Sequence, residues 1–124
     1  MKNRETLSLT DVEWRVMRAL WQLEEPSLGQ ILKALEGSGW SKHALISFLK
    51  RLEAKGAVAI DTSRRPSRYR ALILREEAQQ SEARAVLDKV YGGDLMLMVS
   101  SAVGAGELSP EETQALIDIL KKGG

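Results

Sequence analysis

The sequence of 124 residues contains no cysteine, a single histidine and three prolines. Without cysteine there can be no disulfide, no thiolate metal site and no cysteine nucleophile. The one histidine, His43, has no ligand partner at helical spacing, so we expect neither a metal nor another cofactor. A membrane span needs about 20 apolar residues, and no stretch here is that long. The N-terminus also lacks the apolar core of a signal peptide, so we expect a cytoplasmic protein that contacts no membrane.

The residue constellations of common enzymes are missing as well. No glycine-rich loop lies between a strand and a helix, where it would bind phosphate. Serine with one distant histidine cannot form a catalytic triad. The acidic pairs Glu76-Glu77 and Glu111-Glu112 fall in first helical turns, where the helix dipole explains them better than acid–base chemistry does. We therefore expect no enzymatic activity.

The net charge of +1 conceals a division between the two halves of the chain. Residues 1–75 carry 14 Lys and Arg against 8 Asp and Glu, a net charge of +6. Residues 76–124 carry 4 against 9, a net charge of −5. This asymmetry favours a first half that meets a polyanion and a second half that does not. We place a domain boundary there and predict domains of residues 1–75 and 76–124.

Helix-start motifs and apolar periodicity predict three helices in the first half. The first begins at a capping box formed by Thr10 and Glu13. The second begins at Ser27, and we expect Gly37 to end it as a left-handed cap. The third runs over residues 41–55. A glycine-containing turn separates the second and third helices, as in a helix-turn-helix.

After the third helix the apolar period changes from that of a helix to that of a strand. Residues 57–61 are rich in β-forming side chains, residues 62–67 have the composition of a turn, and residues 68–73 alternate basic and apolar side chains. We expect a β-hairpin with a basic tip. The fold class is therefore mainly α, with an N-terminal winged helix-turn-helix of three helices and a hairpin wing, followed by a helical dimerisation region.

The third helix has two faces of different chemistry. Its inward face is apolar and consists of Leu45, Phe48, Leu49 and Leu52. Its outward face mixes hydrogen-bond donors, a hydroxyl and a methyl-rich side chain, which suits a DNA major groove. From this helix we expect DNA contacts by Ser41, Lys42, His43, Ile46, Ser47, Lys50 and Arg51. From the wing we expect contacts by Arg64, Arg65 and Arg68.

The second half is predicted to be helical, with breaks at Gly92-Gly93 and near Gly104. Residues 95–99 are apolar on every side of their helix, and such a helix must be covered all round. The alternative cover is the chain's own winged helix, but the stripes there already have partners in one another, so we expect a second copy of the chain. The expected dimer contacts are Val86, Val90, Tyr91, Leu95, Met98, Val99, Leu116, Ile117 and Leu120.

Several short motifs recur together in one known family. They are EWRVM at 13–17, Trp40-Ser41, RLEAKG at 51–56, VYGG at 90–93 and LSPEE at 108–112. Together they resemble the penicillinase-repressor family, the BlaI/MecI/CopY group of winged-helix transcriptional repressors, over nearly the whole chain. The resemblance implies a homodimer that binds a palindromic double-stranded DNA operator and represses transcription in bacteria.

Three departures from the family pattern concern specificity and induction. Ala44 stands near a position where the family has Thr, so operator preference can differ. The β-lactam-responsive members are cut by a sensor protease at an Asn-Phe bond, but the corresponding position here falls near Ser100-Ser101, so a sensor protease is not supported. The copper-responsive members carry Cys-x-Cys motifs, which are absent here.

One alternative belongs to another functional class. A winged-helix adaptor could bind proteins rather than DNA, through Ile46 and the apolar residues 95–103. An arginine-rich wing argues against this alternative, and a mobility shift with random duplex DNA separates the two.

Overall fold

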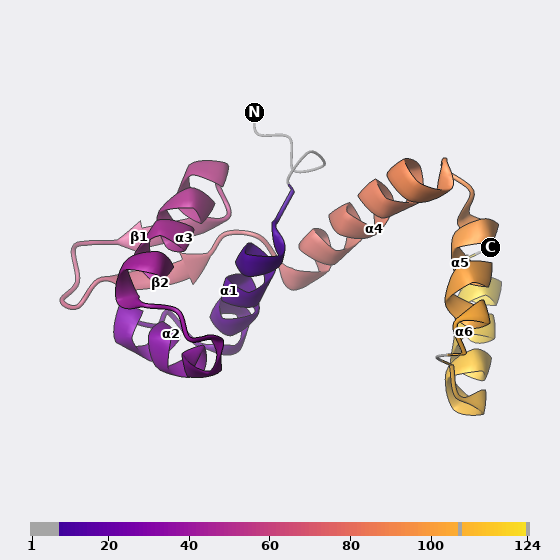
Figure 1. The fold of residues 1–124 in the computed structure, drawn as a ribbon, viewed down its shortest axis with the longest axis horizontal. Helices are drawn as coiled ribbons and strands as arrows, with labels where there is room; N and C mark the ends of the chain where they lie inside the picture. The colour runs from indigo at the N-terminus through magenta and orange to yellow at the C-terminus, as the bar shows by residue number, and fades with distance from the viewer. Residues whose placement is uncertain (1–7, 107, 124) are drawn as a thin grey trace. The chain divides into compact units, whose positions relative to one another are not determined.

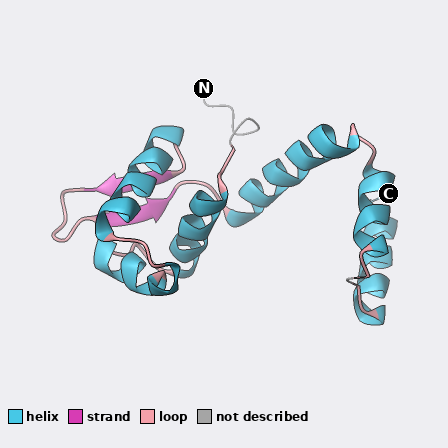
Figure 2. Ribbon diagram, in the orientation of Figure 1, coloured by secondary structure: helices cyan, strands magenta, loops and turns pink. Residues whose placement is uncertain are grey.

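A computed structural model describes residues 8–106 and 108–123 of the chain, which form mainly helices and one two-stranded hairpin (Figures 1 and 2). No helix within those ranges is long and apolar enough to cross a membrane. The elements follow in the order α1 (Asp11–Gln22), α2 (Leu28–Ala34), the 3-10 turn η2 (Glu36–Ser38), α3 (Lys42–Lys55), β1 (Val58–Asp61), β2 (Arg68–Ala71), α4 (Arg75–Tyr91), α5 (Leu95–Gly104) and α6 (Pro110–Gly123). Three helices followed by a hairpin confirm the predicted winged-helix fold class.

The chain forms two compact units, one up to Glu82 and one from Ala83. The division lies inside α4, so the first turns of this helix belong to the winged-helix unit. The functional boundary after residue 75 stays a prediction.

The core of the first unit lies between α1, α2, α3 and the hairpin. Apolar residues from each of these elements meet there, together with residues just before α1, in the chain that leads into α4 and in the first turn of α4, since each element has one apolar face to bury. The buried apolar residues are Leu9, Val16, Met17, Ala19, Leu20, Ile31, Leu45, Leu49, Leu52, Ala57, Val58, Ile73 and Ala78. Leu45, Leu49 and Leu52 of the predicted inward face of α3 are among these buried residues. The remaining residue of that face, Phe48, is half-buried and packs against this core.

The predicted end of the second helix is wrong. Gly37 lies inside η2, and the left-handed residue is Gly39, with φ of +78°. The cause is Ser38, whose hydroxyl donates to the carbonyl of Leu35 at 2.6 Å and accepts from the amide of Trp40 at 3.1 Å. These two bonds stabilise one further turn of chain, so the reversal that needs a glycine comes two residues later.

The hairpin pairs its strands antiparallel, with Val58 opposite Ala71 and Asp61 opposite Arg68. The second strand was predicted to continue to residue 73, but it ends at Ala71. Ile73 instead turns inward: its side chain is buried, and its carbonyl accepts a hydrogen bond of 3.0 Å from the indole of Trp21. The bond to α1 replaces the strand pairing and fixes the chain just before α4.

An ion pair between a half-buried lysine and a buried glutamate joins the start of α1 to the end of α3. The Lys55 ammonium donates to Glu13 Oε1 at 2.5 Å and to the Ser8 carbonyl at 2.7 Å. The Glu13 side chain is fully buried, and no donor from the described residues reaches its second oxygen, Oε2. Burial raises the pKa of Glu13, but hydrogen bonds from Lys55 and the Thr10 amide, with the charges of Lys55 and Arg51, outweigh burial and hold the pKa below its usual value.

The second unit contains the end of α4 together with α5 and α6. Its last two helices begin at side-chain caps: the Asp94 carboxylate accepts from the Leu97 amide, and Ser109 and Glu112 cap each other reciprocally at 2.9 and 3.1 Å. Among the described side chains from Ala83 onward, none is buried. This unit therefore has no apolar core of its own within one described chain.

We expect Lys55→Met to destabilise the first unit by about 3–5 kcal/mol, because it leaves the Glu13 carboxylate buried without its cation. In the natural protein the folded pKa of Glu13 lies below the unfolded value of about 4.3, so its stabilisation is present above that pH and is lost as pH falls through the folded pKa. In the Lys55→Met variant, burial becomes the main influence on the Glu13 carboxyl and raises its pKa. The penalty of the variant should therefore shrink as pH falls from 7 toward 5.

Urea unfolding followed by tryptophan fluorescence measures this effect selectively, since Trp14, Trp21 and Trp40 all lie in the first unit. The control is Lys33→Met, which removes an exposed lysine from α2. A Lys55→Met penalty that does not vary between pH 7 and 5 would contradict the ion-pair interpretation.

Candidate nucleic-acid interface

The start of α3 is set by a cap and by aromatic packing. The Ser41 hydroxyl accepts from the Ala44 amide at 3.1 Å, which satisfies a free N–H of the first turn. The Trp40 ring packs edge-on against Phe48, with centroids 5.0 Å apart. The guanidinium of Arg15, a residue of α1, lies over the same Trp40 ring, 4.9 Å from its centroid. Through this contact α1 supports the turn that leads into α3.

The outward face of α3 is open to solvent over most of its length. His43, Ser47 and Lys50 are exposed, and Ile46 between them is half-buried. The opposite face supplies Leu45, Leu49 and Leu52 to the core, as predicted. The helix therefore presents donors, a hydroxyl and a partly accessible apolar side chain on one surface, and this combination can contact the edges of base pairs.

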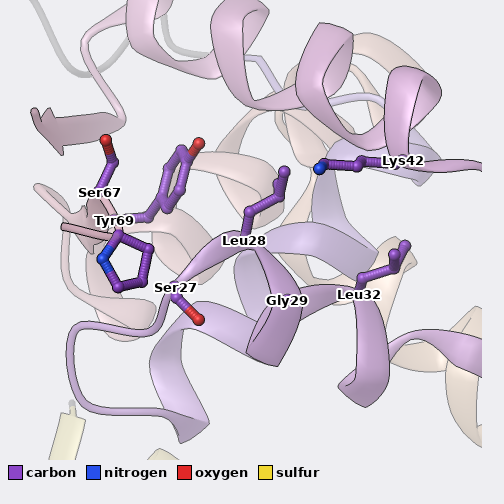
Figure 3. A pocket seen from close by; sticks show the side chains of 8 residues that line it. Ser27, Leu28, Gly29, Leu32, Lys42, Ser67 and Tyr69 are labelled. Carbon is purple, nitrogen blue, oxygen red and sulfur yellow. The ribbon is translucent and has the colours of Figure 1, made fainter.

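Lys42 and Arg51, two other predicted contacts, lie on the flanks of this face. Lys42 is exposed and lines an open groove formed by the start of α2 and the wing (Figure 3). Leu28, Pro66 and Tyr69 are among the residues that line this groove. The guanidinium of Arg51 lies 5.9 Å from the centroid of the Phe48 ring, which holds this side chain along α3. Positive charge thus stands on both sides of the outward face.

The wing arginines differ in their surroundings. Arg65 is exposed at the tip. Arg64 is paired with the carboxylate of Glu25, at 3.0 Å, and Arg68 donates to the backbone carbonyl of the same residue at 3.1 Å. Sequence reasoning missed Glu25, which lies 39 residues from Arg64 in the chain and shows no local pattern that would connect the two.

Two titratable groups shape the hairpin. Hydrogen bonds from the hydroxyl and amide of Ser63 lower the pKa of Asp61 and make it a turn-forming carboxylate at the start of the tip. Burial, with the charge of Glu53, raises the pKa of Tyr69. The Tyr69 phenol is therefore neutral at physiological pH and adds no negative charge beside Lys42.

The predicted dimer contacts of the second unit are partly accessible in the single chain. Val90, Leu95 and Ile117 are exposed, whereas Val86, Tyr91, Met98, Val99 and Leu116 are half-buried. The side chain of Leu120 lies outside the described residues. The sequence-based set missed four large apolar side chains that are more than two-fifths exposed, namely Met96, Leu97, Val103 and Ile119. The first three lie on α5, which is apolar all round, so periodicity did not distinguish them from their neighbours, whereas Ile119 lies on α6.

Within the described residues, no group of three or more His, Asp or Glu side chains is placed to hold a metal ion. The sequence over residues 9–122 matches a family model described as the penicillinase repressor. The chain belongs to the penicillinase repressor family. This family comprises regulatory repressors rather than enzymes.

Relatives from this family align with almost the whole chain. The methicillin resistance regulatory protein MecI of Staphylococcus aureus strain N315 is 24% identical over 97% of this chain and 98% of that protein. The penicillinase repressor of Bacillus licheniformis is 28% identical over 92% of this chain and 90% of its own length. A penicillinase repressor of Staphylococcus aureus is 26% identical over 97% of this chain and 95% of its own length. The family resemblance noted in the sequence motifs is therefore confirmed.

We expect Ser41→Ala to lower the stability of the first unit by about 1 kcal/mol, because the Ala44 amide loses its cap. Ser41→Asp should preserve stability, since aspartate caps as well as serine does. Tryptophan-monitored urea unfolding measures both. Ser47→Ala is the matched control: it lies in the exposed middle of α3, where alanine has the higher helix propensity, and it should not destabilise. Equal losses for Ser41→Ala and Ser47→Ala would show that the cap is unimportant.

Proposed function

We propose that this member of the penicillinase repressor family is a sequence-specific DNA-binding transcriptional repressor that acts as a homodimer on a palindromic operator. The observation that carries the proposal is the open outward face of α3, with Ser47 and Lys50 exposed and positive charge on both flanks. The names of its relatives, a resistance regulatory protein and penicillinase repressors, support the same function.

In this proposal α3 enters the major groove of DNA. His43, Ile46 and Ser47 read base edges, because the groove offers acceptors, donors and thymine methyl groups that match these side chains. Ser41, Lys42, Lys50 and Arg51 at the ends and flanks contact phosphates or base edges near them. The inward face of α3 is held rigidly by the core, so the reading face has a defined orientation.

The wing supplies further contacts to the backbone next to the groove. Arg65 is exposed and ready to pair with a phosphate. Arg64 and Arg68 contribute from the base of the tip. Such contacts fix the position of the protein on DNA and strengthen binding to every sequence, but they carry little sequence information.

Dimerisation through the second unit accounts for its missing core. The side chains of Leu95, Met96, Leu97 and Val103 are 53%, 66%, 50% and 46% exposed in the single chain. Water contact over so many large apolar groups is unfavourable, and a second copy of the same surface removes it through an isologous interface. Two recognition helices held by a twofold axis require half-sites about one turn of DNA apart, ~34 Å, or a multiple of it.

Salt dependence of DNA binding tests the proposal. With about four phosphate contacts per protomer, a dimer makes about eight, and log K should fall against log salt with a slope of roughly −7. Arg65→Ala should weaken binding to all sequences about equally and make this slope shallower. Mobility shifts with duplex DNA across a salt series measure both effects. A slope near zero, or no binding to any duplex at low salt, would favour a protein-binding adaptor.

A variant on α3 serves as the control that separates contacts to base edges from contacts to the DNA backbone. Ser47→Ala removes a proposed base contact on α3 and should relax sequence preference by about 1–3 kcal/mol per half-site, with the salt slope unchanged. Selection of bound fragments from a random duplex library reads out the preference. If the wing variant rather than the helix variant changes the selected sequence, the roles of the two elements are reversed.

A charge on α5 tests the dimer. Leu97 lies outside the first unit and is half exposed in the single chain, so Leu97→Asp should leave the first unit folded but bury an unpaired charge in the proposed interface, at several kcal/mol. Sedimentation should then detect monomers, and operator affinity should fall steeply while the urea unfolding of the first unit is unchanged. Gln80→Asp, at an exposed polar position of α4, is the charge-matched control. A Leu97→Asp variant that remains dimeric would place the interface elsewhere.

A further inference from the structure

One residue of the loop between α1 and α2 contacts two of the three wing arginines. The Glu25 carboxylate Oε1 accepts from Arg64 Nη1 at 3.0 Å, and the Glu25 backbone carbonyl accepts from Arg68 Nη1 at 3.1 Å. The side chains of Arg64 and Glu25 are 49% and 53% exposed, so this ion pair lies at the surface. An acidic residue thus occupies an arginine that the proposed function assigns to DNA phosphate.

The position of Glu25 is built into the fold. Its φ of +40° is left-handed, and among the described residues it is the one residue other than glycine with a positive φ. Such a conformation is disfavoured for a residue with a Cβ and persists where surrounding contacts hold it. Next to it, the buried Pro26 accepts a hydrogen bond of 2.9 Å from the Tyr69 amide of β2. The loop and the wing are therefore joined through backbone, and the carboxylate is held beside Arg64.

We propose that Glu25 is an internal competitor for DNA phosphate. This inference rests on the proposed DNA-binding function. A guanidinium pairs with a carboxylate and with a phosphate through the same kind of N–H group, so the Arg64 N–H that bonds Glu25 must leave the carboxylate before it can donate to a phosphate. The carboxylate left behind then stands near the phosphate and repels it. Glu25 thereby weakens the contacts of the wing with DNA phosphates, whatever the DNA sequence. A larger share of the binding free energy then comes from the base contacts of α3.

The competing interpretation is that Glu25 only positions the wing. The two interpretations predict opposite signs. Removal of a positioning contact weakens DNA binding, whereas removal of a competitor strengthens it. A gain of affinity is also an effect that damage to the fold does not produce.

The experiment compares full-length Glu25→Gln with the natural protein on random-sequence duplex DNA across a salt series. Glutamine keeps the size of the side chain and the left-handed backbone but removes the charge. We expect a gain in affinity of roughly fivefold to twentyfold for the dimer at low salt, since an exposed ion pair is worth up to about fivefold in each protomer. The salt slope should become steeper by up to about 2, because Arg64 in each protomer then pairs with phosphate without exchange.

Glu24→Gln is the matched control, because it removes the same charge from the neighbouring exposed residue of the loop. It should give a much smaller gain. In an Arg64→Ala background most of the gain from Glu25→Gln should disappear, because only the repulsion between the Glu25 carboxylate and the phosphate is then left to remove. In an Arg65→Ala background the full gain should remain.

The inference is overturned if Glu25→Gln binds as tightly as the natural protein or more weakly, if Glu24→Gln gives an equal gain, or if the gain is undiminished in the Arg64→Ala background. In each of these cases the natural protein still binds DNA, and the proposed function stands. If the natural protein binds no duplex at low salt, the proposed function and this inference fail together.

Discussion

A helix that buries one face must expose another, and this geometric constraint governs α3. The α-helical period sends Leu45, Leu49 and Leu52 into the core, so His43, Ser47 and Lys50 have to face outward. Three contacts of the first unit hold that helix in one orientation. The Ser41 cap fixes its first turn, the pairing of Lys55 with Glu13 fixes its last, and the aromatic contact of Trp40 with Phe48 fixes the turn before it.

The parts of the fold that were predictable from sequence are those determined by neighbours within about four residues. Thr10 with Glu13 and Ser27 with Gln30 form capping boxes because each pair closes on itself locally. The inward stripe of α3 was predictable for the same reason, since its spacing is that of the helix. The error over Gly37 and Gly39 shows the limit of local reasoning. Both glycines tolerate a left-handed backbone, and the hydrogen bonds of Ser38 decide which one adopts it.

The features that sequence reasoning could not supply join residues far apart in the chain. Glu13 and Lys55 are 42 residues apart, and Glu25 and Arg64 are 39 residues apart. Each residue alone is typical of a solvated surface, and nothing in its immediate neighbourhood names its partner. The charge asymmetry of the chain predicted a basic surface, but it could not show that an acid is held against one of the wing arginines. For the candidate site, the sequence therefore predicted the helix and the wing, whereas the partners of Arg64 and Arg68 are visible only in the folded structure.

The lack of buried side chains among the described residues beyond Ala83 has a consequence for gene dosage. In the proposed homodimer, this half gains its apolar core only when two chains meet, so its folding and its association form a single equilibrium. Well below the dissociation constant, the amount of dimer then varies with the square of the amount of chain. A twofold drop in synthesis would lower the dimer about fourfold, so operator occupancy would respond more steeply than protein level. Modest changes in expression or turnover would thus be amplified without any bound effector.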